Sequence, residues 1–372
     1  MVERDQGAKR LAELLLLSAG SPTPEPPMRP LAHTRYVERL LNAFSESRNP
    51  AIVLHDHPDP DAIGSALALA KLLKERLQLA ASLVYGGVIA RAENRALVDE
   101  INIRLTPASD FAWEAADATA LLDCQPMSGN HALPPHLVPT AVIDHHPPIG
   151  GIHPSTFTDI RPEYGATCTI LTEYLEDAQV HVDEGLATAL FYGIKTDTQD
   201  LGRQASGIDA LAYLRLFVAA DKRMLSRIQN PRLPLKYFRA LHRALEQVEI
   251  HENAAIARLG DLEMPETTGE TADLIVRLEG IRWSLTIGRF RSRLLFSLRN
   301  TDTNADAGAL AEHLAEGSGH GGGHWRMAGG FIPLEDKSST EIQRTEEEII
   351  KRFLEYVQAP RVAIPLLDHQ VR

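Results

Sequence analysis

The stretch His55-Asp56-His57-Pro58-Asp59-Pro60-Asp61-Ala62-Ile63-Gly64-Ser65 decides how this sequence is interpreted. It follows an apolar run at 51–54 that is typical of a buried strand, and it precedes a helical pattern over 62–76. Asp59 and Asp61, together with His55, offer carboxylate and imidazole ligands from one strand-to-helix turn. This donor set favours Mn²⁺, Mg²⁺ or Co²⁺ over a zinc site built from thiolates. The alternative is a capping turn, in which the aspartates only satisfy the first amides of the helix.

Further acidic turns follow other runs of the same half of the chain. Runs at 82–85, 119–122 and 140–143 also predict strands, and they alternate with helical stretches as in a parallel α/β sheet. Three of the four predicted strands stop at His55, Asp123 and Asp144, and Asp197 follows an apolar run at 190–194. In open α/β sheets, ligands bind beyond the carboxyl ends of the strands. We therefore expect these acid-bearing turns to form one site.

The second half of the chain has a different predicted order of strands and helices. Strand patterns at 250–259, 283–289 and 293–299 precede a helix at 307–316, a glycine cluster and a helix at 340–356. These patterns predict a smaller α+β domain. The expected division is an N-terminal amphipathic helix and proline-rich linker (1–30), a catalytic domain (31–222), a connector (223–240), a substrate-binding domain (241–357) and an irregular tail (358–372).

Charge and cysteine content exclude several classes of protein. The 372 residues carry 38 basic and 50 acidic side chains, which give a net charge of −12. Such a chain is not expected to coat long duplex DNA or an anionic membrane. Its two cysteines, Cys124 and Cys168, show no disulfide or zinc spacing, which indicates a reducing, cytoplasmic compartment. The apolar run at 11–19 is interrupted by Glu13 and is shorter than the ~20 residues that a membrane span needs.

Taken together, the motifs resemble those of the DHH phosphoesterase superfamily. They are His-x-x-Pro-Asp-x-Asp-Ala at 55–62, the isolated Asp123, Asp144-His145-His146, and Gly-Ile-Lys-Thr-Asp-Thr at 193–198. Near the C-terminus, Gly321-Gly322-Gly323-His324 and Ser297-Leu298-Arg299 resemble the associated DHHA1 substrate domain. The similarity spans roughly residues 48–335. Each motif is weak alone, but all of them occur in the order of the family.

The resemblance implies a parallel-sheet DHH domain, a smaller α+β DHHA1 domain, and an active site in the cleft between them. It implies two divalent ions, with manganese expected and magnesium or cobalt as alternatives. One ion is assigned to His55, Asp59 and Asp123, and the other to Asp61, Asp123, His145 and Asp197. A hydroxide held between the ions is the expected nucleophile, and the residues expected to act in catalysis are Asp123, Asp144 and His146. The expected substrate contacts are Arg299, Gly321, Gly322, Gly323 and His324. His57 competes with His55 as a ligand, but the family spacing favours His55.

The size and domain pairing resemble the nanoRNases and phosphoadenosine-phosphate phosphatases. The expected function is that of a manganese-dependent oligoribonuclease, or of a phosphatase acting on 3′-phosphoadenosine 5′-phosphate. Other candidates are a cyclic-dinucleotide phosphodiesterase, an exopolyphosphatase or pyrophosphatase, and a catalytically silent nucleotide sensor. The expected partner is a short oligonucleotide or small nucleotide, not a long duplex or a membrane, and a homodimer is compatible with the sequence.

Overall fold

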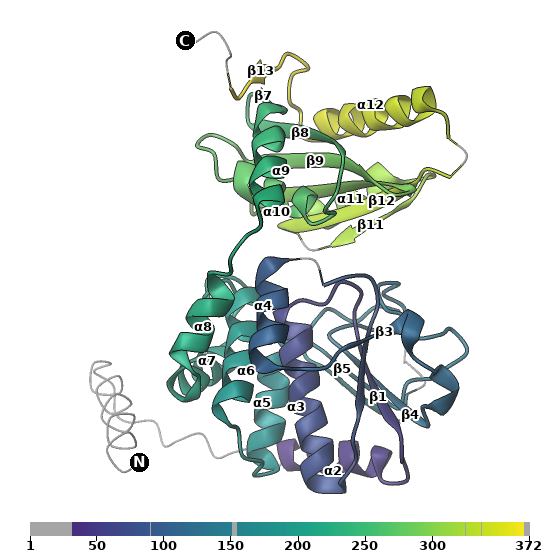
Figure 1. Ribbon diagram of the computed structural model, residues 1–372, viewed down its shortest axis with the longest axis vertical. Coiled ribbons are helices and arrows are strands. Elements are labelled where there is room, and N and C mark those ends of the chain that lie inside the picture. The colour runs from purple at the N-terminus through teal and green to yellow at the C-terminus, as the bar shows by residue number, and fades with distance from the viewer. Residues whose placement is uncertain (1–31, 90, 151–154, 324, 336, 368–372) are drawn as a thin grey trace. The chain divides into compact units, whose positions relative to one another are not determined.

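The computed structural model describes residues 32–89, 91–150, 155–323, 325–335 and 337–367. The chain divides into two compact units, 1–231 and 232–372 (Figure 1). The predicted N-terminal helix and His324 lie outside the described residues. No helix within the described ranges is long and apolar enough to span a membrane.

The N-terminal unit is built on a six-stranded parallel sheet in the order β3-β2-β1-β4-β5-β6. The predicted parallel α/β fold is thereby confirmed. The central strands β1, β4 and β5 are neighbours, so the residues that follow them meet at one edge of the sheet. The strands are β1 (Pro50–Leu54), β2 (Ser82–Tyr85), β3 (Thr106–Pro107), β4 (Ala118–Leu122), β5 (Ala141–Asp144) and β6 (Phe157–Ile160).

Alternate residues of these strands face two different apolar clusters, as the strand period of two requires. Ile52, Leu54 and Leu122 face the main core, which the helices cover, whereas Val53 and Leu121 face a smaller cluster with Trp113 and Leu133. The helices of this unit are α2 (Ala32–Phe44), α3 (Pro60–Leu77), α4 (Ala92–Ile101), α5 (Thr167–Asp177), α6 (Glu184–Asp197), α7 (Gly207–Ala219) and α8 (Lys222–Gln229).

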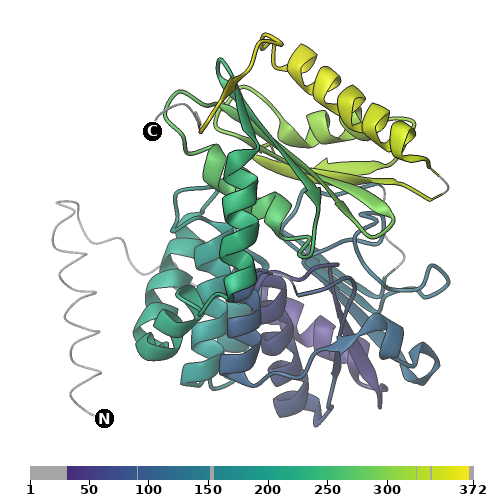
Figure 2. The ribbon, with the colours of Figure 1, turned by 45° about the horizontal axis from the view of Figure 1, so that its top comes forward.

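The C-terminal unit is built on a seven-stranded mixed sheet in the order β11-β12-β10-β9-β8-β7-β13. Among the described strands of this sheet, β8 and β9 are the one parallel pair. The strands are β7 (Val248–His251), β8 (Ala254–Asp261), β9 (Trp283–Phe290), β10 (Arg293–Asn300), β11 (His320–Gly323), β12 (Met327–Pro333) and β13 (Ile364–Pro365). One face of this sheet packs on α11 (Ala307–Ala315) and α12 (Ser339–Tyr356), and α12 runs along the sheet in Figure 2. Ser284 and Thr286, on the other face, donate to α10 (Thr267–Ile275), and α9 (Leu235–Glu246) also belongs to this unit.

Several local expectations were wrong. The run at 250–259 is a hairpin of β7 and β8, because Glu252, with φ 60°, turns the chain. The glycine cluster, to which the sequence assigned no secondary structure, is the edge strand β11, since it pairs with β12. The tail is not wholly irregular, because β13 pairs with β7. The short strands β3 and β6 were not predicted from the sequence.

Candidate metal centre

The motif at 55–65, which forms the turn between β1 and α3, both caps the helix and groups candidate metal ligands. Asp59 caps α3, because one of its oxygens accepts from the amides of Asp61 (2.9 Å) and Ala62 (3.1 Å). The same oxygen lies 3.6 Å from Nε2 of His55. Asp61 is fully buried, and its carboxylate accepts from the amides of Thr167 (2.7 Å) and Cys168 (2.8 Å). The cap and a ligand cluster therefore share one turn.

Asp123 lies at the centre of the cluster. It follows β4 with a left-handed backbone (φ 58°), which is rare for a residue other than glycine and is found at functional sites. Its Oδ2 lies 3.6 Å from Nε2 of His55, and its Oδ1 lies 3.6 Å from Nε2 of His145. The two oxygens of this buried carboxylate thus face two different imidazoles.

A second group of donors forms around His145. Its Nε2 lies 3.1 Å from Asp197 and 4.0 Å from Asp61. Asp197, which follows the apolar run at 190–194, is the last residue of helix α6. Helices α3 and α6 approach closely at Gly193, because this residue has no side chain. A Cβ added there would lie only 3.0 Å from the carbonyl oxygen of Pro60 and 3.1 Å from Cα of Asp61. This close packing brings the end of α6 to the turn that carries Asp61.

Asp144 and His146 form a hydrogen-bonded pair beside Asp123. Oδ1 of Asp144 lies 2.8 Å from Nδ1 of His146, and that nitrogen lies 3.7 Å from Oδ1 of Asp123. The buried side chain of Gln125 donates from Nε2 to Oδ2 of Asp144 (2.7 Å). Its Oε1 accepts from the amide of Ile149 (2.8 Å). The loop after β5 is held in shape by these bonds.

The crowding of carboxylates shifts the pKa values of the site. Burial raises the pKa of Asp123 to about 6, with a further contribution from Asp59. Burial and the charge of Asp123 raise the pKa of Asp61 well above its usual value. Burial opposes the charged form of His55, but Asp59 and Asp123 outweigh it and raise the pKa of His55 to about 10. Burial also opposes ionisation of Asp144, but the bond to His146 lowers its pKa to about 2.

These residues fit divalent cations. The described residues form three groups, and within each group the candidate ligand atoms lie within 4.8 Å of one another. The groups are His55, Asp59 and Asp123; Asp61, His145 and Asp197; and Asp123, His145 and His146. Nε2 of His145 is buried, and the described residue nearest to it among these acids is Asp197 at 3.1 Å, which is an ion-pair distance without hydrogen-bond geometry. Oxygen-rich ligands with imidazole suit Mn²⁺ or Mg²⁺. Cations at these groups also offset the repulsion between buried carboxylates.

The predicted substrate contacts lie in the C-terminal unit. Arg299 is buried and paired with Asp273, and its Nη1 donates to the carbonyl of Leu298 (2.8 Å). Gly321 packs against α11, since a Cβ there would lie 2.1 Å from the carbonyl of Ala311, whereas a Cβ on Gly322 would meet open space. Gly323 is exposed at the end of β11. His324 lies outside the described residues.

Sequence reasoning missed the side chains that hold the ligands in place. Thr167 donates from Oγ1 to Oδ1 of Asp123 (2.9 Å), and Gln125 fixes Asp144. Neither belongs to a motif that was singled out, and only the position of Gln125 two residues after Asp123 hinted at a role. His57 is not in the ligand groups found among the described residues, and its Nδ1 lies 3.2 Å from the backbone of Val88.

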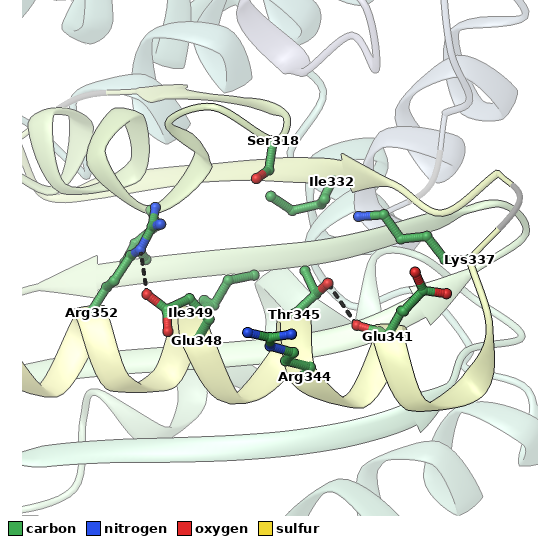
Figure 3. Close-up of a pocket in the computed structure, with 10 residues that line it drawn as sticks. Ser318, Ile332, Lys337, Glu341, Arg344, Thr345, Glu348, Ile349 and Arg352 are labelled. Atoms are coloured by element: carbon green, nitrogen blue, oxygen red, sulfur yellow. Dashed lines mark hydrogen bonds and ion pairs between the residues drawn. The ribbon is translucent and has the colours of Figure 1, made fainter.

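A separate groove of about 290 Å³ lies between α12 and β12 of the C-terminal unit (Figure 3). Arg352 in its wall pairs with Glu348 at 3.1 Å, and Glu341 belongs to the cap of α12 with Ser338. Its described lining contains none of the predicted site residues. The chemistry is therefore assigned to the cluster around Asp123.

Comparison with known proteins shows what the N-terminal unit is similar to. Residues 50–194 match the DHH family, N-terminal domain. This part of the chain is therefore similar to proteins of the DHH phosphoesterase superfamily. This match covers the motif at 55–62, Asp123, and Asp144-His145-His146, and it ends just before Asp197.

Individual relatives extend the likeness. The uncharacterized protein MJ1633 of Methanocaldococcus jannaschii is 33% identical over 269 residues, 71% of this chain and 55% of that protein. The chain thus spans about half the length of this curated relative. An exopolyphosphatase-related protein from Bacteroides fragilis is 16% identical with a TM-score of 0.65, over 88% of this chain and 98% of its own. RecJ from Thermus thermophilus, in complex with Mn²⁺, is 15% identical with a TM-score of 0.50, over 91% of this chain and 56% of its own. At these identities the two structures show a shared fold.

Proposed function

We propose that this protein is a divalent-metal-dependent phosphoesterase that hydrolyses short oligonucleotides, 3′-phosphoadenosine 5′-phosphate, or both. The observation that carries the proposal is the position of Asp123, whose two oxygens face His55 and His145 at 3.6 Å each. A carboxylate between two ligand groups suits a pair of cations that share it. If bound there, such cations would polarise a phosphoryl oxygen and lower the pKa of a bound water towards neutrality.

The protein's own residues support the reaction around these ligands. The bond between Nδ1 of His146 and Oδ1 of Asp144 fixes the orientation of the imidazole. Burial opposes protonation of His146, but Asp144 and Asp123 outweigh it and raise its pKa. A charged His146 can therefore donate to a phosphate oxygen while Asp144 stays ionised. Asp123, Asp144 and His146 are the groups that we propose act in catalysis.

Substrate contacts are proposed for the C-terminal unit, which we interpret as a DHHA1 domain. Arg299 and the backbone of Gly321, Gly322 and Gly323, with His324, are the proposed contacts with phosphate or ribose. The open space beside Gly322 supports this, because it allows a ligand to approach the backbone. The net charge of −12 favours a short substrate over a long polymer.

We propose manganese as the metal, a homodimer as a compatible assembly, and a cytoplasmic location. A phosphoanhydride hydrolase is the second candidate, because the Bacteroides fragilis protein of similar fold is exopolyphosphatase-related.

A hydrolysis assay with alternative substrates tests the proposal. Purified protein is treated with EDTA, reloaded with Mn²⁺, Mg²⁺ or Co²⁺, and given a dinucleotide, a cyclic dinucleotide, 3′-phosphoadenosine 5′-phosphate, and polyphosphate. We expect turnover of the dinucleotide or of 3′-phosphoadenosine 5′-phosphate, strongest with Mn²⁺ and lost with EDTA. Asp123→Asn should abolish it, whereas Asp200→Asn, at an exposed acid paired with Lys195, should not. Full turnover after EDTA, or hydrolysis of polyphosphate alone, would overturn the proposal.

A further inference from the structure

Trp325 differs in its packing from the other two tryptophans of the chain. Trp283 is buried in the core of the C-terminal unit, and Trp113 packs against the smaller cluster of the N-terminal unit. Trp325 is half-buried, and it belongs to none of the apolar clusters formed by the described residues. Core packing therefore does not explain a large aromatic side chain at this position.

The backbone beneath Trp325 is held firmly. Its carbonyl accepts from the amide of Ala307 (2.9 Å) and from Nδ2 of Asn300 (3.2 Å). The amide of Asn300 also donates to the carbonyl of Arg326 (2.8 Å), and Asn300 is buried. These bonds tie the turn between β11 and β12 to the end of β10 and the start of α11. An aromatic ring on such an anchored turn loses little conformational freedom when it binds a ligand.

The surroundings of the ring have the chemistry of a base-stacking site. The guanidinium of Arg326 lies 4.6 Å from the centre of the Trp325 ring. On the neighbouring strand, the space beside Gly322 is open, and Gly323 is exposed. Aromatic rings and guanidinium planes stack on nucleobases, whereas a phosphate or polyphosphate chain gains nothing from an indole face.

We propose that Trp325, with Arg326 stacked on it, binds a nucleobase of the substrate, so that the C-terminal unit selects nucleotides over base-free phosphates. This inference rests on the proposed function, because it names the part of the substrate that the second unit recognises. Trp325 is a substrate-binding residue that touches the base and takes no part in bond cleavage.

The test compares Trp325→Ala with Trp325→Phe in the full-length, manganese-loaded protein. The substrates are a dinucleotide and its two analogues in which one base is replaced by hydrogen. Loss of one stacked base should raise the KM of Trp325→Ala for the dinucleotide by roughly 5- to 150-fold, with kcat little changed. Trp325→Phe should retain most of the affinity. For the analogue that lacks the stacked base, wild type and Trp325→Ala should have equal KM values. Phe238→Ala, which truncates an exposed aromatic residue of α9, is the matched control.

Binding is measured separately by tryptophan fluorescence. Adenosine monophosphate should quench the tryptophan fluorescence of the wild-type protein, and this quenching should be lost in both Trp325 variants. Ribose 5-phosphate should not quench the fluorescence of any of the three proteins. Melting temperatures check that the variants fold. A KM change below twofold in Trp325→Ala, or equal changes for the dinucleotide and both analogues, would overturn the inference. If wild type hydrolyses no nucleotide, the proposed function fails, and the quenching experiment alone decides whether Trp325 stacks on bases.

Discussion

Thr167 donates a 2.9 Å hydrogen bond from Oγ1 to Oδ1 of Asp123, and both side chains are buried. Thr167 is also the first residue of α5, and its amide donates to Asp61 at 2.7 Å. One residue therefore positions two of the proposed metal ligands, through its side chain and through its backbone. Such supporting partners strongly influence metal affinity.

Thr167→Val should weaken metal binding while preserving the shape of the side chain. The hydroxyl that orients Asp123 is lost, but the amide that holds Asp61 remains. We expect a loss of about 10- to 100-fold in Mn²⁺ affinity or in kcat/KM at limiting Mn²⁺. Calorimetric titration and kinetics at several Mn²⁺ concentrations measure it. Thr167→Ser keeps the hydroxyl and is the control, and equal behaviour of the two variants would contradict the prediction.

Gln125→Glu should make stability dependent on pH. The substitution places a carboxyl beside Oδ2 of Asp144, where Nε2 of Gln125 now lies at 2.7 Å. Burial and the like charge raise the folded-state pKa of the introduced carboxyl above its unfolded value. Its protonated form can still donate, so stability is retained at low pH and lost as the pH rises through the folded-state pKa. We expect a deficit of about 1–3 kcal/mol at pH 8 that shrinks at pH 5.

Denaturant unfolding at the two pH values measures this difference against wild type. Gln125→Met, which does not titrate, is the control and should show a similar deficit at both. A Gln125→Glu deficit that is unchanged between pH 5 and pH 8 would show that Asp144 does not repel the introduced group.

Manganese should bind more tightly as the pH rises. Asp59 and Asp123 outweigh burial and raise the pKa of His55 to about 10, so this imidazole carries a proton at neutral pH. A metal binds the neutral imidazole, so binding must release that proton. Affinity should rise by up to about tenfold per pH unit for each proton displaced. Titration calorimetry in buffers of different ionisation enthalpy counts the released protons, and no release between pH 6 and pH 8 would disprove the expectation. His242→Gln, at an exposed histidine of α9, should leave the count unchanged.

Arg299→Ala should impair substrate binding without loss of metal. Arg299 lies in the C-terminal unit and belongs to none of the ligand groups found in the described part of the chain. A charge-assisted bond to phosphate is worth about 1.5–3 kcal/mol, or roughly 10- to 150-fold in kcat/KM. Kinetics with a dinucleotide, metal analysis and melting temperature together test this, because Arg299 is also paired with Asp273 and its loss affects stability. Arg289→Ala removes a more exposed arginine–aspartate pair of the same unit, with Asp261, and should leave KM unchanged.

The sequence by itself determined the parallel sheet and the ends of its central strands. Apolar runs of strand length before His55, Asp123 and Asp144 identify buried strands, because the alternation of strands and helices is a local property of the chain. Parallel strands present their carboxyl ends at one edge, so these three residues were predicted to meet. The order β1-β4-β5 makes their strands neighbours.

Only the tertiary structure decided how the ligands are held. Thr167 is separated from Asp123 by 44 residues and from Asp61 by 106. No local sequence pattern can therefore predict the hydrogen bonds that join them. Asp197 reaches the site from the end of a helix, because Gly193 lets α6 approach the turn at Asp61. Such contacts depend on which elements pack together and how closely, whereas side-chain periodicity encodes only the face that each element buries.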